Sequence, residues 1–431
     1  MMKIDIGGLK RDLEELGRIG RDENGGVTRP SFSTPDLEAR AWLKARIEAV
    51  GLAYRVDGAG NIFGRLEGAD TAGGAATGPG SGAAGADRGA PRPPKTVMAG
   101  SHIDTVINGG IFDGALGVLA ALECLRVIKE SGRRLARPLE VAAFTDEEGN
   151  LVGDFLGSRA FLGRLKRDVL EKELTSYGRP LKDILKRTEF TVESILNAHY
   201  AAPELEAYLE LHIEQGPVLE TEDVPIGIVN NIAGKHYRWC SFTGTASHAG
   251  TTPLELRQDA FLGLADFALR STQLVATHHY GSMVTVGKVQ VKPGVFSIVP
   301  GQADFSFEFR SHSAETLKTL ERVLFNMADD IAVTRGLGFS SRIVDETKPV
   351  AISPRLTEIL RAECQKLGYP WLMMPSGAGH DAQILAEVAD TAMIFIPSPD
   401  GISHSPKETV RWEDLEKGAN LLLQALVRLA T

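Results

Sequence analysis

The stretch Val97-Met-Ala-Gly-Ser-His102-Ile-Asp104 joins a short apolar run to two residues of metal-binding type. The apolar run 97–100 is typical of a short buried β-strand. A second run, Leu139-Glu-Val-Ala-Ala-Phe144, ends shortly before the pair Glu147-Glu148. Open α/β sheets collect their ligands just beyond the C-terminal ends of strands. The sequence therefore predicts an α/β fold with a functional site at one edge of the sheet.

Two more apolar runs repeat this arrangement. The run 207–211 leads into His212-Ile-Glu-Gln215, and the run 392–396 leads through a loop to His404. Asp113 lies a few residues beyond the first group. The four predicted strand ends thus offer three histidines and at least three carboxylates. Such a set of imidazoles and carboxylates is the ligand inventory of a two-metal hydrolytic site.

The rest of the chain predicts a discontinuous catalytic domain. Helical patterns occur at 34–51, opened by Thr34-Pro35, and at 114–131. Further along, the pattern becomes strand, helix, strand, strand, helix, strand, which is the ferredoxin-like order. Apolar α/β segments resume after it, so we expect an inserted unit that can act as a lid. The expected division is residues 1–230 with 346–431 as the catalytic domain, 231–345 as the inserted lid and dimerisation domain, and 68–94 as a flexible Gly/Ala-rich insertion without catalytic role.

Composition narrows the class of protein. The chain has 431 residues with 43% hydrophobic content, and no apolar run reaches membrane-spanning length. The N-terminal stretch 1–6 lacks the apolar segment of a signal peptide, so we expect a cytoplasmic location. The three cysteines are far apart and odd in number, which favours buried thiols over disulfides. A net charge of -9 without long basic blocks argues against nucleic acid or an anionic membrane as partner.

Seven stretches in a fixed order carry a family resemblance. They are Gly100-Ser-His-Ile-Asp-Thr105, 109–117, Asp146-Glu-Glu-Gly149, Leu211-His-Ile-Glu-Gln-Gly-Pro217, Ser247-His-Ala-Gly250, Gly377-Ala-Gly-His-Asp381 and Gly401-Ile-Ser-His-Ser-Pro406. Together they make the chain resemble the M20-type metal-dependent amidohydrolases. The branch that it resembles contains N-carbamoyl-L-amino-acid amidohydrolases, allantoate amidohydrolases and β-ureidopropionase. This resemblance implies a zinc-exopeptidase-like catalytic body with an inserted ferredoxin-like α+β lid.

The resemblance also implies a role for each metal ligand. Asp113 matches the carboxylate that bridges two ions, Glu148 a terminal carboxylate, and His102, His212 and His404 the imidazoles. A mixed imidazole and carboxylate set suits two divalent ions per subunit, Zn, Mn, Co or Ni. The position of His212 is commonly Asp or Glu in the exopeptidase and aminoacylase branches. Histidine there favours the ureido-cleaving enzymes.

The residues beside the ligands predict the proton chemistry. Adjacent residues at a strand end point in different directions, so Glu148 can bind metal while Glu147 faces the substrate. Glu147 resembles the general base of the family. Asp104 is expected to accept the second ring N–H of His102. Asp146 is expected to be a surface or hydrogen-bonding neighbour without a role.

Substrate recognition rests on weaker signals. In the stretch 303–310, phenylalanines alternate with polar residues, so Arg310 lies on the polar face, where the family binds a substrate carboxylate. Gln215, Gly379 and His380 resemble residues that hold the carbamoyl group, although His380 could instead cap or pack at a helix start. The chain departs from the family at Ser297, where Asn is common as a further carboxylate ligand. Serine is shorter and has no amide N–H, which leaves the substrate open.

His248 lies in the inserted domain, where the family's histidine crosses a homodimer interface and polarises the scissile carbonyl.

The favoured function is hydrolysis of the ureido C–N bond of an N-carbamoyl-L-amino acid to the amino acid, ammonia and CO2. Allantoate and 3-ureidopropionate are neighbouring substrates, and an M20 peptidase or aminoacylase is a more distant alternative. A metal-binding scaffold without activity is disfavoured because Glu147 accompanies the full ligand set.

Overall fold

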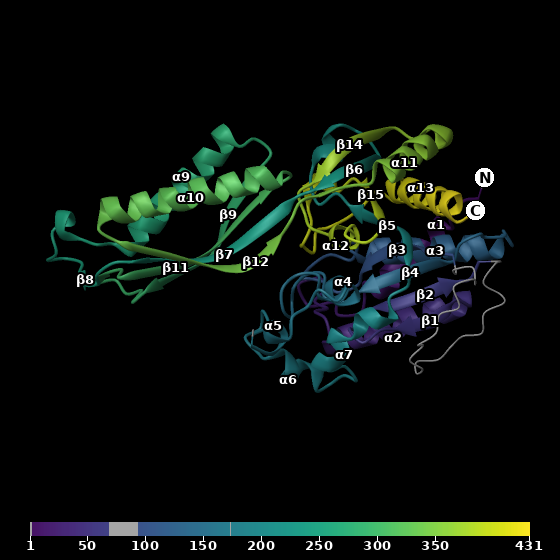
Figure 1. Ribbon diagram of the computed structural model, residues 1–431, viewed down its shortest axis with the longest axis horizontal. Helices are drawn as coiled ribbons and strands as arrows, with labels where there is room; N and C mark the ends of the chain where they lie inside the picture. Colours follow the sequence, from purple (N-terminus) through teal and green to yellow (C-terminus); the bar gives the residue numbers. More distant parts are fainter. Residues whose placement is uncertain (1, 69–93, 173) are drawn as a thin grey trace, which may run out of the picture. The chain divides into compact units, whose positions relative to one another are not determined.

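Parallel strands β4 (Leu139–Phe144), β3 (Thr96–His102), β5 (Leu205–Ile213) and β15 (Asp390–Ile396) form the centre of the largest sheet (Figure 1). This computed structural model describes residues 2–68, 94–172 and 174–431. Every residue of β3 and β4 is buried. Parallel strands covered on both faces read as continuous apolar runs, which is why the sequence identified them. The predicted α/β class is confirmed.

Antiparallel strands extend the sheet on both sides. Its order among the described residues is β1-β2-β4-β3-β5-β15-β6-β13, with β14 also paired to β6. The outer strands are β1 (Ala53–Val56), β2 (Ile62–Leu66), β6 (Ile226–Ile232), β13 (Val350–Ala351) and β14 (Trp371–Ser376). Because the four central strands run in one direction, their C-terminal ends meet at the same edge.

Helices α1 (Ile6–Leu16), α3 (Ala115–Glu130), α11 (Pro354–Leu367) and α13 (Trp412–Ala430) pack together. Helix α2 (Thr34–Val50) begins after Ser33, whose side chain accepts a hydrogen bond from the Asp36 N–H, and ends at Gly51 with φ 73°. The predicted helix at 34–51 is therefore confirmed. The shorter helices are α4 (Leu156–Phe161), α5 (Arg167–Lys172), α6 (Leu181–Leu185), α7 (Val192–Leu196), η1 (Ala198–Ala201), α8 (Val218–Thr221), α12 (Asp381–Leu385) and η3 (Pro399–Gly401).

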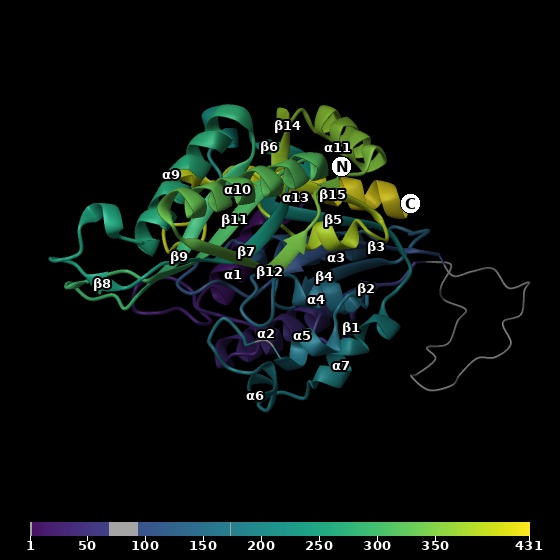
Figure 2. The same ribbon diagram turned by 60° about the vertical axis from the view of Figure 1, so that its left-hand side comes forward.

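A four-stranded antiparallel sheet with the order β12-β7-β11-β9 forms the second fold element. Its strands are β7 (Gly234–Thr243), β9 (Met283–Lys292), β11 (Gln302–Ser311) and β12 (Gly338–Thr347). Helices α9 (Ala260–His278) and α10 (Ala314–Arg335) cover one face of this sheet (Figures 1 and 2). The phenylalanines of β11 are buried against them. The predicted ferredoxin-like order is present, with a small pair of strands β8 (Ser247–His248) and β10 (Ile298–Val299) and the turn η2 (Leu254–Leu256) added to it.

The chain divides into two compact units. The larger unit comprises Met1–Asn230, Ile352–Met374 and His380–Thr431, and the smaller unit comprises Asn231–Ala351 and Pro375–Gly379. Residues 346–351 and 375–379 thus belong with the smaller unit, where β13 pairs with the end of β6 and the Ala233 N–H donates to the Ser376 carbonyl. The Gly/Ala-rich stretch 68–94 lies outside the described residues except for its two ends.

The cysteines and the helices bear on two expectations from composition. Cys124, Cys240 and Cys364 are buried and free, as predicted. Every helix within the described ranges is too short or too polar to pass through a bilayer.

Candidate metal centre

The C-terminal ends of the central strands bring the predicted ligands together. His102 is the last residue of β3, and His212 lies near the end of β5. Asp113 lies just before α3, in the loop that follows β3. Two of the resulting groups of donors contain Asp113, each with ligand atoms within 4.8 Å of one another: His102, Asp113 and His212, and Asp113, Glu148 and His404.

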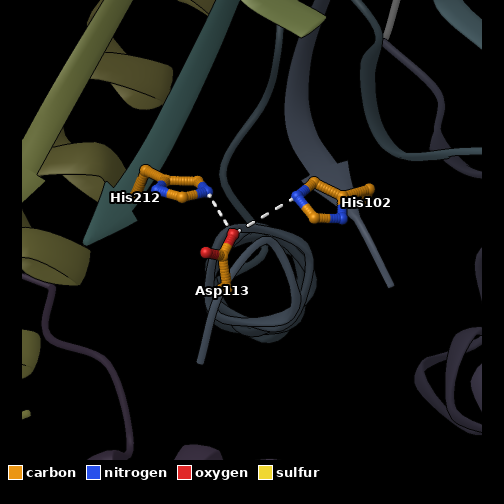
Figure 3. Close-up of side chains that lie close together, drawn as sticks. All are labelled: His102, Asp113 and His212. Carbon is orange, nitrogen blue, oxygen red and sulfur yellow. Dashed lines mark ion pairs between the residues drawn. The ribbon is translucent and has the colours of Figure 1, made fainter. Parts of the chain in front are cut away.

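The first half-site is formed by His102, His212 and one oxygen of Asp113. Asp113 Oδ1 lies 3.6 Å from His102 Nε2 and 3.2 Å from His212 Nε2. Figure 3 shows this oxygen between the two imidazole rings. All three side chains are buried.

The second half-site is formed by Glu148, His404 and the other oxygen of Asp113. His404 Nε2 lies 3.3 Å from Asp113 Oδ2 and 3.4 Å from Glu148 Oε1. The two oxygens of one aspartate therefore face two separate groups of ligands. That division is what a carboxylate bridging two cations requires.

The protonation pattern of the imidazoles fits a bound cation. His102 Nδ1 lies 3.0 Å from the Asp104 carbonyl oxygen, and His212 Nδ1 lies 2.9 Å from the Ile213 carbonyl oxygen. A carbonyl oxygen only accepts, so each Nδ1 carries a hydrogen, and each Nε2, which faces Asp113, is left to hold a proton or a cation. Lone pairs facing a carboxylate are unfavourable unless a proton or a cation lies between them. Glu148 Oε1 is also buried without a hydrogen-bond partner, so the residues fit a divalent ion.

Asp104 accepts the second ring N–H of His102, as the sequence predicted, and it does so with its main-chain oxygen. The Nδ1–H of His102 donates to the Asp104 main-chain oxygen. Asp104 Oδ1 lies farther from this nitrogen, at 3.7 Å. The Glu147 and Glu148 N–H groups instead donate to this carboxylate, each at 3.4 Å. Spacing alone does not say which oxygen of Asp104 accepts the ring N–H. Asp104 therefore orients the loop that carries Glu147 and Glu148.

Asp146 is fully buried, so the expectation of a surface position is wrong. Its φ is 58°, and its carboxylate accepts hydrogen bonds from the N–H groups of Asn150 and Leu151. A left-handed aspartate that bonds its own loop makes a tight turn possible directly after β4. The expectation of a hydrogen-bonding neighbour is correct.

Burial and charge control the acidity of this cluster. Burial, with Asp113 as the next cause, raises the pKa of Glu148 to about 7. Burial also raises the pKa of Glu147 well above its usual range. The hydrogen bond with Asp113 raises the pKa of His404 to about 9. Because metal ligands bind in the unprotonated form, ion binding by Glu148 and His404 would release the protons that they carry.

Two predicted substrate residues lie in the larger unit. Gln215 donates from Nε2 to Asp113 Oδ2 at 2.7 Å, and its Oε1 is buried without a partner. His380 is buried, with its ring centroid 4.6 Å from that of His212. It occupies the N-cap position of α12, but its side chain makes no capping hydrogen bond. His380 therefore packs at the start of α12 without a side-chain capping hydrogen bond.

The other predicted residues, His248, Ser297, Arg310 and Gly379, belong to the smaller unit. His248 Nδ1 accepts hydrogen bonds from the N–H groups of Gly250 and Thr251, so its ring hydrogen is on Nε2. The Arg310 guanidinium pairs with Glu308 and donates to the Gly377 carbonyl at 2.9 Å.

Two buried glutamates near the centre were missed by sequence reasoning. Glu210 accepts hydrogen bonds from Ser101 Oγ at 2.6 Å and from the Ala382 N–H at 3.0 Å, which joins β5 to β3 and α12. A charged residue inside the apolar run 207–211 is a signal that could have identified it. Glu408 contacts the Asp113 loop, and no local pattern points to it.

Comparison with known proteins agrees with this geometry. The sequence model of peptidase family M20/M25/M40 matches residues 98–428 of this chain. An N-carbamoyl-L-amino acid amidohydrolase from Geobacillus stearothermophilus is 36% identical, with 98% of each chain covered. An allantoate amidohydrolase from Escherichia coli (strain K12) is 33% identical, over 98% of this chain and 97% of its own. A crystal structure of a hydantoinase/carbamoylase family amidase from Burkholderia vietnamiensis is 32% identical and superposes with a TM-score of 0.85, covering 99% of this chain and 98% of its own.

Proposed function

The chain belongs to peptidase family M20/M25/M40, and we propose that it hydrolyses the ureido C–N bond of an N-carbamoyl-L-amino acid or a closely related ureido acid. The observation that carries this proposal is the division of Asp113 between two half-sites, with Glu147 beside them. Full-length relatives that are named amidohydrolases support the ureido bond over a peptide bond. Allantoate is the nearest alternative substrate, and 3-ureidopropionate is the next.

We infer that the half-sites hold two divalent ions per subunit, of Zn, Mn, Co or Ni. His102, His212 and Asp113 would hold one ion, and Asp113, Glu148 and His404 would hold the other. Ions in such a site polarise a carbonyl oxygen and make water acidic enough to attack at neutral pH.

Glu147 is the proposed general base. Its carboxylate is buried, and Oε2 lies 3.6 Å from His102 Nε2, at the edge of the first half-site. In the proposed reaction Glu147 takes a proton from the attacking water and gives it to the leaving nitrogen of the amino acid. The new C–O bond replaces the bond from the carbamoyl carbon to that nitrogen. The products are the amino acid and carbamic acid, which decays to ammonia and CO2.

Substrate binding is proposed for Gln215, His380, Gly379, Arg310 and Ser297. The buried ring of His380 beside His212 supports a role near the carbamoyl group. The guanidinium of Arg310 can donate two parallel hydrogen bonds to a substrate carboxylate once its ion pair with Glu308 is released. Ser297 offers only a hydroxyl where the family commonly has Asn, so it is the residue expected to tune which acid is accepted.

A homodimer formed through the smaller unit is also proposed. Large apolar side chains are exposed on η2 and α9 of that unit: Leu254, Leu256, Phe261, Leu262 and Leu269. An exposed apolar group of this kind suits burial against a second copy. In the proposed dimer, the Nε2–H of His248 donates to the scissile carbonyl in the neighbouring subunit. A cytoplasmic location and the absence of nucleic-acid and membrane partners stay predictions from composition.

A substrate panel tests the proposed function. The purified chain, loaded with each candidate ion, is given N-carbamoyl-L-amino acids, allantoate and 3-ureidopropionate, and ammonia release is measured. Dipeptides and N-acetyl-L-amino acids are assayed in parallel for amine release. Faster turnover of the ureido acids supports the proposal. Faster turnover of the peptides or acetyl derivatives would refute it in favour of a peptidase or aminoacylase.

A further inference from the structure

Glu408 joins two loops that are far apart in sequence. Its Oε1 accepts hydrogen bonds from the Phe112 N–H at 2.9 Å and from the Asp113 N–H at 3.1 Å, across 296 and 295 residues. The side chain is buried. Glu408 itself belongs to the turn that follows His404, because its N–H donates to the Ser405 carbonyl. One carboxylate thus connects the backbone of the bridging aspartate to the segment that carries His404.

Ser403 gives a second connection between the same loops. Its Oγ lies 2.8 Å from Asp113 Oδ2 and 3.1 Å from Glu408 Oε2. Both carboxylates thus lie beside this hydroxyl, which has one hydrogen and donates to one of them at a time. Asp113 Oδ2 is the oxygen that faces His404. The contacts made by Ser403 and Glu408 therefore converge on the second half-site.

The close packing at Gly110 indicates that the position of Glu408 is specific. A Cβ atom at Gly110 would lie 2.0 Å from Glu408 Oε1 and 2.5 Å from its Cβ. Real Cβ atoms do not approach other atoms so closely, so the glutamate side chain lies directly on the glycine backbone. The loop before Asp113 is thus shaped to receive this one carboxylate.

We propose that Glu408, together with Ser403, is a positioning residue that sets the bridging carboxylate of Asp113 against His404 and thereby builds the second half-site. The inference rests on the proposed two-ion function. It follows from geometry: Asp113 and His404 come from loops on different strands, and the structure shows Glu408 bonded to the backbone of one loop and located in the other. Removal of a residue behind a metal ligand typically lowers metal affinity about 10–100-fold.

Ion-binding measurements on three variants test this inference. Each chain is stripped of metal and titrated with Zn²⁺ against a competing chelator, so that two dissociation constants per chain are obtained. Glu408→Ala should bind one ion as the wild type does and the other about 10–100-fold more weakly. Glu408→Gln should stay close to the wild type, because its amide oxygen can still accept both backbone hydrogen bonds. Ser403→Ala should weaken the same ion by less, since it leaves the backbone bonds in place.

A matched control separates positioning from general stability. Asp57 is an equally buried carboxylate that accepts two backbone hydrogen bonds, from Ala59 at 2.9 Å and Asn61 at 3.0 Å, both within the β1–β2 turn. Asp57→Ala should lower the thermal midpoint of the metal-free protein and leave both ion affinities unchanged. His404→Ala already removes a ligand of the second half-site, so adding Glu408→Ala to it should not weaken ion binding further. His102→Ala removes a ligand of the first half-site, so adding Glu408→Ala to it should also weaken the ion of the second half-site.

The possible results distinguish the inference from the proposed function. Two ions bound by Glu408→Ala with wild-type affinities would overturn the inference while leaving the function intact. The same would follow if Asp57→Ala lost an ion to the same degree, or if Glu408→Gln were as weak as Glu408→Ala. Should Glu408→Ala not fold, Ser403→Ala decides by the same measurement. A wild-type chain that binds no ion would refute the proposed function itself, and with it the inference.

Discussion

Replacement of Gly114 by alanine should remove His102 from the metal centre. A Cβ atom at Gly114 would lie 2.3 Å from His102 Nε2 and 2.4 Å from each of Cδ2 and Cε1. Ordinary contacts need at least about 3.4 Å, so the ring must move by roughly 1 Å or more. Metal–imidazole bonds of about 2.0–2.1 Å tolerate deviations of only about 0.2 Å. The displaced ring can therefore no longer serve as a ligand of the first half-site.

The size of the effect can be bounded from below. Changes that act on a metal ligand only indirectly cost up to about 100-fold in affinity. Displacement of a direct ligand should exceed that value, or about 2.8 kcal/mol for the first half-site. The backbone adds a cost of its own, because Gly114 has φ 65° and ψ -51°, where an L-residue is strained by about 1–3 kcal/mol. Both effects act in the same direction.

Gly132→Ala is the matched control. Gly132 has a similar φ of 66°, but no atom lies within 4 Å of the position that its Cβ would take. Both variants should therefore show a lower thermal midpoint, while only Gly114→Ala should lose affinity for one ion in the chelator titration. Two ions bound by Gly114→Ala at wild-type affinity would refute the steric argument. Equal loss of an ion in Gly132→Ala would show that backbone strain, and not the clash with His102, is responsible.

Three further predictions concern turnover. Glu147→Gln should keep both ions and a similar KM but lower kcat about 10²–10⁴-fold, because the amide cannot accept a proton; a drop below about tenfold with normal ion content would reassign the base. Arg310→Ala should mainly raise KM for carboxylate-bearing substrates, and Ser297→Asn should shift preference among them; unchanged saturation by the substrate would place the carboxylate elsewhere. His248→Ala and Glu147→Gln subunits, each inactive alone, should regain about a quarter of wild-type sites when refolded together, since random pairing makes half the dimers mixed. No recovery in a mixture with proven mixed dimers would show that His248 serves its own subunit.

The sequence alone was sufficient for the architecture. Each central strand is a buried apolar run that contains or is followed by a residue of metal-binding type, so β3, β4, β5 and β15 and their common edge could be predicted. The caps of α2 and the ferredoxin-like order were equally local signals. All of these features depend on residues close together in the chain. Residue types near strand ends were therefore enough to predict which candidate ligands share one edge, while the role of each ligand came from the family resemblance.

Only the tertiary structure decided how those groups face one another. The sequence predicted that Asp104 accepts the ring N–H of His102, but only the structure shows that its main-chain oxygen does so while its carboxylate holds the loop of Glu147. It gave no sign of Glu408, whose partners lie 295 and 296 residues away. Such contacts depend on how loops with left-handed residues such as Asp146 turn after their strands. Apolar periodicity specifies strands and buried faces, but the aim of a polar side chain is set by folded loops that meet only in three dimensions.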